Sequence, residues 1–169
     1  VDRNPSGALG RGAARNFGAI GEGVALVVFY EKPGCAGNAR QKVLLKAAGH
    51  TLVVRDLLAT EWSAATLYPF LEGLPVPEWF NRNAPKVKDG TVVPGSLDAH
   101  QALEMLLDDP LLIRRPLLEV GGACRAGFEL QAIHDWIGLS IPKAMAGEDF
   151  EACRHGNEAT SLCAARERQ

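Results

Sequence analysis

The sequence predicts an α/β domain with a mixed four-stranded sheet. The main evidence comes from the first and last segments of this domain. An apolar run at 24–30 is typical of a buried strand, good helix formers occupy 39–48, and the β-branched run at 51–55 predicts another strand. Strand, helix and strand this close together form a βαβ unit with parallel strands. We therefore expect residues 24–55 to build half of the sheet.

The other half of the sheet is expected near the end of the domain. Short strands are predicted at 117–120 and 123–128, joined by a tight turn at Gly121-Gly122. Helical periodicity follows at 128–137. This second unit is a β-β-α arrangement.

Helices are expected between the two units. Ser63 is placed to cap a short helix, and Pro110 closes a periodic apolar stretch that starts near Asp98. The remaining predictions are a proline-entered helix at 75–82, its end at 83–85, and a turn at 87–90. The complete order, β-α-β, helices, β-β-α, is that of a thioredoxin-like fold with a helical insertion. The predicted parts are a flexible leader at 1–23, the domain at 24–137 and a mobile extension at 138–169.

Composition excludes several classes of function. The net charge of −2 offers no basic surface for nucleic acid or anionic membrane. No apolar run approaches the roughly 20 residues that a membrane span needs. The four cysteines are widely spaced, which argues against a disulfide scaffold and a zinc site and favours a reducing cytoplasm. His50, His100 and His134 lack ligand spacing and are interpreted as ordinary surface or helix residues.

Cys35 is the candidate nucleophile. It follows Pro33-Gly34 at the junction between the first strand and the start of a helix. Unpaired backbone N–H groups and the helix dipole favour an anion there, so we expect the pKa of the thiol to be lowered and its reactivity raised. The alternative is a small buried apolar residue.

Arginines are the candidate anion ligands. Arg82 lies at a predicted helix end, Arg115 directly precedes Pro116, and Arg125 lies in the hairpin. Each alone is typical of a solvated surface charge. A cis Pro116 would direct the neighbourhood of Arg115 toward the cysteine loop.

Three segments together resemble the ArsC-related family: FYEKPGCAGNARQKVLLKAAGH, PVPEWFNRNAPKVK and LLIRRPLLEVGGACRAGFE. This family contains glutaredoxin-dependent arsenate reductases and Spx-type regulators, and the chain is most similar to small nitrogenase-associated proteins. The resemblance implies that Cys35 attacks arsenate, that Arg82, Arg115 and Arg125 bind the oxyanion, and that Pro116 is the cis-proline. Asn38 is included among the expected anion ligands. No resident cofactor is implied, since glutathione and glutaredoxin would act as external reductants.

Some residues depart from the reductase pattern. Ala39 stands where the reductases have an arginine, and Arg40 comes one position later, about 100° further around a helix. Glu31 replaces a frequent histidine, and a carboxylate there would repel thiolate and arsenate. Asn38 replaces the second cysteine of the CxxC switch in Spx-type regulators.

The function is therefore open between two classes. One is an arsenate-reductase-type thiol oxidoreductase that uses Cys35. The other is a thioredoxin-like adaptor, non-catalytic or redox-regulatory, linked to nitrogen fixation. Cys124 is expected to be a buried strand residue, and Cys153 or Cys163 is a candidate resolving thiol.

Overall fold

The computed structural model describes residues 23–140. The predicted leader (1–23) and C-terminal extension (138–169) lie almost wholly outside this range. The strands are β1 (Leu26–Glu31), β2 (Thr51–Asp56), β3 (Leu117–Val120) and β4 (Ala123–Ala126). The α-helices are α1 (Ala36–Ala47), α2 (Ala64–Leu71), α3 (Pro85–Lys88), α4 (Ala99–Asp108) and α5 (Leu130–Ile137), and short 3-10 turns occupy Val76–Trp79, Pro94–Ser96 and Pro110–Leu112.

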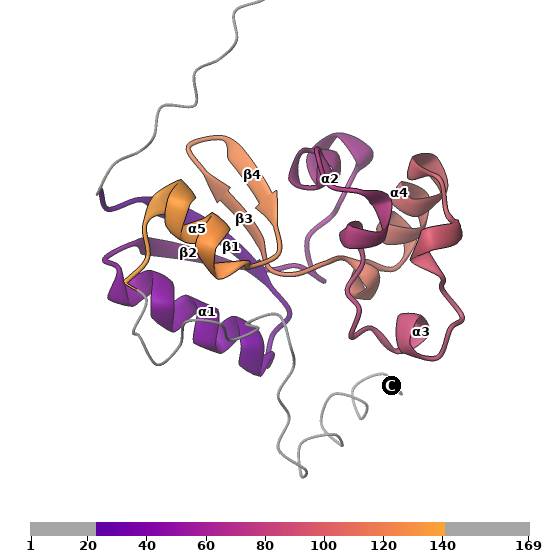
Figure 1. Cartoon of the computed structure of the whole chain (residues 1–169), viewed down its shortest axis with the longest axis horizontal. Helices are drawn as coiled ribbons and strands as arrows, with labels where there is room; N and C mark the ends of the chain where they lie inside the picture. Colours follow the sequence, from indigo (N-terminus) through magenta and orange to yellow (C-terminus); the bar gives the residue numbers. More distant parts are fainter. Residues whose placement is uncertain (1–22, 141–169) are drawn as a thin grey trace, which may run out of the picture.

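The four strands form one mixed sheet in the order β2-β1-β3-β4 (Figure 1). β1 pairs in parallel with β2, with Phe29 opposite Val54, and antiparallel with β3, with Phe29 opposite Leu118. β3 and β4 form the hairpin that the Gly121-Gly122 turn predicts. The predicted α/β class and mixed four-stranded sheet are confirmed.

Each face of the sheet has its own apolar core. One core places Phe29, Leu118 and Phe128 with α1 and α5, including Leu45 and Ile133. The other places strand residues under the helical insertion, including α2 and α4. Its members include Tyr30, Leu117, Leu67, Phe70 and Leu106. The sheet is thus a middle layer, as Figure 1 shows.

The helical insertion contains the helix cap predicted at Ser63 and the helix predicted from near Asp98, with local corrections elsewhere. Ser63 and Thr66 form a capping box at α2, and Asp98 and Gln101 form another at α4. The predicted turn at 87–90 is partly wrong, because a one-turn helix, α3, starts at Pro85 and ends at Lys88. The predicted helix at 75–82 is reduced to a 3-10 turn over Val76–Trp79. Proline favours the first position of a helix, which explains the start of α3 at Pro85. Pairing with a distant segment of the chain ends the predicted helix at 75–82 early.

His50 is not an ordinary surface residue. It is 6% exposed, accepts a hydrogen bond from Ala25 N at Nδ1 (3.1 Å), and its Nε2 lies 2.7 Å from the carbonyl oxygen of Gly138. It thereby joins the entry to β1 with the end of α5. In residues 23–140, no helix has the length and apolar character that a bilayer span requires.

Candidate functional site

Cys35 lies at the N-terminus of α1. It is the residue before the first helical position, with an extended backbone, and its side chain makes no capping bond. Its N–H donates to the carbonyl of Lys32, and its own carbonyl accepts from Ala39 N. Gly34, at φ 77°, supplies the left-handed turn that brings the chain into the helix. The half-buried thiol therefore lies beside the positive end of the α1 dipole.

A short pairing between distant segments forms the opposite wall of the site. Phe80 and Ile113 make an antiparallel bridge. On either side of the bridge, Arg114 N donates to the carbonyl of Trp79 (2.8 Å) and Asn81 N donates to that of Leu112 (2.7 Å). This pairing brings Arg82 next to the Arg114-Arg115 segment. Residues more than thirty positions apart in sequence thus meet in one wall.

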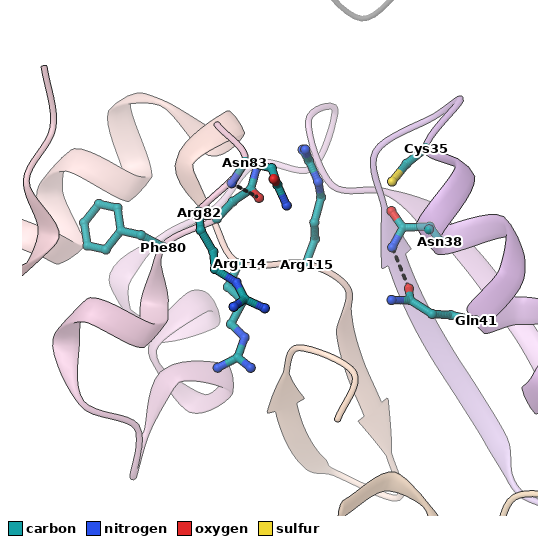
Figure 2. Close-up of a pocket in the computed structure, with 10 residues that line it drawn as sticks. Cys35, Asn38, Gln41, Phe80, Arg82, Asn83, Arg114 and Arg115 are labelled. Atoms are coloured by element: carbon teal, nitrogen blue, oxygen red, sulfur yellow. Dashed lines mark hydrogen bonds between the residues drawn. The ribbon is translucent and has the colours of Figure 1, made fainter. Parts of the chain in front are cut away.

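Arg115 precedes a cis peptide bond to Pro116, as the family resemblance implies. Its Nη1 atom is buried and has no hydrogen-bond partner within residues 23–140. A buried guanidinium nitrogen without a partner is costly, and an acceptor on a bound anion would satisfy it. Figure 2 shows Arg115 extending into the space between Cys35 and Asn83.

Cys35, Arg82 and Arg115 line one pocket of about 370 Å³, counting its open mouth. Figure 2 shows Cys35 on one side, with Arg82 and Arg114 on the far wall across Arg115. The rest of the lining is mainly polar: Gly37, Asn38, Gln41, Phe80, Asn81, Asn83 and Arg114. The polar and cationic character of this lining favours a small anion.

Asn38 lines the pocket and also braces the cysteine loop. It is 2% exposed; its Nδ2 donates to Gln41 Oε1 (2.8 Å) and its Oδ1 accepts from Lys32 N (3.4 Å). The amide thus joins the residue before Pro33 to the helix that follows Cys35. Its hydrogen bonds within the protein indicate a bracing role.

The structure does not bring Arg125 into this pocket. Its guanidinium carbon lies 4.9 Å from the ring centroid of Trp136 on α5, in a separate groove beside β4. Arg125 is opposite Leu118 in the hairpin, and Leu118 belongs to the core beneath α5, so the register directs Arg125 to that face. Arg40 is also absent from the lining of the pocket.

The other described cysteine lies in an unfavourable place for a thiolate. Cys124 is half-buried in β4 and pairs with Glu119 across the hairpin. Burial raises the pKa of the Cys124 thiol, and the negative charge of Glu119 adds to this effect. Cys153 and Cys163 lie outside the described residues. Within 23–140, no group of three His, Cys, Asp or Glu residues is placed to hold a metal ion.

Sequence reasoning missed some residues of the pocket. Arg114 is ion-paired with Glu78 (3.1 Å) and lies beside Arg115, a position that the Arg-Arg-Pro sequence could have indicated. Gln41 lies three positions after Asn38, the spacing of one helical face. Asn81 and Asn83 had no signal in the sequence, because the Phe80–Ile113 bridge places them there.

Comparisons with known proteins agree with this fold. Residues 30–136 match the ArsC family. A Rhodospirillum rubrum protein described as "Uncharacterized 15.7 kDa protein in draG 3'region" is 46% identical over 127 residues, which cover 75% of this chain and 87% of that protein.

Solved structures show the same similarity. The arsenate reductase from Vibrio cholerae superposes with a TM-score of 0.56 at 21% identity, over 68% of this chain and 99% of that one. A possible arsenate reductase from Streptococcus mutans UA159 gives a TM-score of 0.50 at 27% identity, over 64% and 98% of the two chains. With its mixed sheet and its extensive sequence match, this chain belongs to the ArsC family and has the thioredoxin-like fold of arsenate reductases.

Proposed function

We propose that this protein is a thiol oxidoreductase of the arsenate-reductase type, with Cys35 as nucleophile. One observation carries the proposal: the buried Nη1 of Arg115 has no partner in residues 23–140 and lines the same small pocket as Cys35. Arg82 contributes a second guanidinium to that pocket. Guanidinium groups and a helix N-terminus together favour a tetrahedral oxyanion next to the thiol.

In the proposed reaction, the thiolate of Cys35 attacks the arsenic atom of arsenate. A sulfur–arsenic bond forms and one oxygen leaves as water after protonation. Arg115 and Arg82 hold the remaining oxygens and stabilise their charge during the attack. The first N–H groups of α1 stabilise the thiolate before it reacts.

The second half of the reaction needs an external thiol, for which glutathione is the proposed source. Its sulfur bonds to Cys35 Sγ, and the electron pair of the sulfur–arsenic bond passes to arsenic, which leaves as arsenite. Two thiols are then oxidised to one mixed disulfide while arsenic gains two electrons. Glutaredoxin would restore the Cys35 thiol by exchange.

Arg125 favours a second candidate function. The resemblance implies that three arginines bind the anion. Arg125, however, stacks on Trp136 and does not line the pocket that contains Cys35. A protein that binds an anion or forms a mixed disulfide without turnover would need fewer ligands. The alternative is therefore a redox-regulatory adaptor. The proposed link of this adaptor to nitrogen fixation rests on the family resemblance. A second support is the relative whose description places it in the draG 3' region.

Arsenate reduction with glutathione and glutaredoxin distinguishes the two candidates. We expect arsenite production by the full chain, its loss in Cys35→Ser, and its retention in the matched Cys124→Ser variant. Arg115→Gln should lower kcat/KM by about 100-fold, the scale of a lost charge-assisted contact in a transition state. If neither the wild-type chain nor any variant produces arsenite, but a disulfide between Cys35 and glutathione still forms, the result would favour the adaptor.

A further inference from the structure

The outer edge of β2 is open. The sheet order places β2 at one end, and within residues 23–140 β2 pairs with β1 alone (Figure 1). Natural proteins usually cover such an edge, or place lysine, proline or a bulge on it. β2 has 6 residues, about 20 Å of strand, and neither charge nor proline occurs at 51–54. Its outer edge therefore remains suitable for pairing with another strand.

Exposed apolar side chains gather at this edge. Val53 is 38% exposed and Val54 is 45% exposed, on opposite faces of the strand. Leu26 of the neighbouring strand β1 is 58% exposed, lies opposite Thr51, and is on the same face as Val53. Apolar surface that is gathered in one place, here on both faces of an edge strand, is typical of an interface with another protein.

The sequence of β2 is complementary to itself in one antiparallel register. A two-fold axis normal to the sheet keeps equivalent faces on the same side, so residues two, four or zero positions apart can lie opposite one another. If Val53 lies opposite the partner's Val53, then Leu52 lies opposite Val54 and Thr51 opposite Arg55. A shift in either direction would place Val53 opposite Arg55 or Thr51. The register centred on Val53 therefore pairs apolar residues with apolar residues.

The charges at the two ends of this pairing are also complementary. Asp56 is exposed and lies on the same face as Leu52, which packs with the core beneath α1. In the register centred on Val53, Asp56 lies opposite the partner's His50. The last turn of α1 leads into His50, whose N–H donates to a carbonyl of that turn. Lys46, an exposed base in the same turn, would thus lie near Asp56 of the other copy.

We propose that the chain forms a homodimer through the outer edge of β2, joining two four-stranded sheets into one continuous antiparallel pairing. The partner is a second copy because β2 matches itself in apolar pairing and in charge. No residue of β2 lines the pocket of Cys35, so the interface and the candidate site are separate.

Sedimentation velocity of the full chain over a range of concentrations tests the proposal. We expect the wild-type chain to dimerise. Val53→Lys places two like charges at the two-fold axis and should raise the dimer Kd by about 100-fold. Val43→Lys is the matched control, with the same change at an exposed position of α1, and should leave the Kd unchanged.

Mixing two charge variants tests the register. Lys46→Glu and Asp56→Lys each place like charges together at both ends of their own homodimer, and each should weaken it by about tenfold. An equimolar mixture should form heterodimers of about wild-type affinity, because opposite charges then meet at both ends. Lys88→Glu, an exposed charge reversal on α3, is the control and should leave the Kd unchanged.

The opposite results would overturn the proposal. A wild-type chain that stays monomeric at every concentration would exclude the dimer, and an unchanged Kd in Val53→Lys would exclude the β2 edge as its interface. If Val53→Lys does not fold, as judged by circular dichroism, the mixing experiment decides. Heterodimers no tighter than the two variant homodimers would exclude the register centred on Val53.

Discussion

Glu31 and Lys42 form an ion pair, with Lys42 Nζ 2.6 Å from Glu31 Oε2. The pair joins the last residue of β1 to the middle of α1, and both side chains are largely buried. From sequence, the Glu31 carboxylate is expected to repel a thiolate and an oxyanion. Lys42 compensates this charge, so Glu31 is compatible with the proposed anion site.

Removal of Lys42 tests this compensation. Lys42→Met leaves the Glu31 carboxylate unpaired near the cysteine loop, which disfavours the thiolate. We expect alkylation of Cys35 by iodoacetamide at neutral pH to slow by about threefold, because a nearby unpaired carboxylate disfavours the thiolate. Glu31→Gln/Lys42→Met should restore the wild-type rate. Peptide mass spectrometry assigns the modified cysteine; an unchanged rate in Lys42→Met would refute the compensation.

Asn38 should stabilise the cysteine loop. Asn38→Ala removes the buried hydrogen bond to Gln41 and the acceptor for Lys32 N. We expect the free energy of unfolding to fall by roughly 1–3 kcal/mol, measured by urea denaturation. The control is Val43→Ala on the exposed face of the same helix, with an effect within about 0.5 kcal/mol. If Asn38→Ala and Val43→Ala lower the free energy of unfolding by the same small amount, the hydrogen bonds of Asn38 do not contribute to stability.

Cys124 should react more slowly than Cys35 near neutral pH. Burial, followed by Glu119, raises the pKa of the Cys124 thiol, so its thiolate forms only at more alkaline pH. The alkylation rate of Cys124 should therefore rise through a pH range above that of an exposed thiol. Glu119→Gln should move this range slightly downward, because burial is the larger cause. Faster reaction of Cys124 than of Cys35 at pH 7 would contradict this expectation.

His50 should contribute to global stability. Because Ala25 N donates to Nδ1, the other ring nitrogen, Nε2, donates to the Gly138 carbonyl. His50→Ala loses both bonds, and we expect a cost of roughly 2–3 kcal/mol in urea unfolding. His100→Ala, at an exposed position on α4, is the control. A cost no larger than that of the control would mean that water replaces both bonds.

Local signals predicted most of the fold. The apolar run before Cys35, the Ser63 cap and the Gly121-Gly122 turn are each encoded within a few residues, and all three are present. The cis peptide bond before Pro116, which the family resemblance implies, is also present. Local periodicity and turn chemistry therefore give the order of the elements and, with the family resemblance, the topology.

Long-range contacts could not be predicted in this way. His50 is buried because it lies between Ala25 and Gly138, and no pattern around residue 50 indicates these partners. Arg125 lies over Trp136 because the register of the β3–β4 hairpin decides which face of the sheet its side chain is on. No residue next to Arg125 in the sequence indicates this register. Contacts between side chains that are distant in sequence depend on how the elements pack, which local patterns do not encode.

Protection of Cys35 by an oxyanion tests the central claim most directly. The rate of Cys35 alkylation in the full chain is measured against arsenate concentration, with chloride at matched ionic strength as the control, in wild type and Arg115→Gln. We expect arsenate to slow the reaction of Cys35 in a saturable way, with the effect lost in Arg115→Gln and absent at Cys124. An alkylation rate of wild-type Cys35 that is independent of arsenate would contradict an anion site at this thiol.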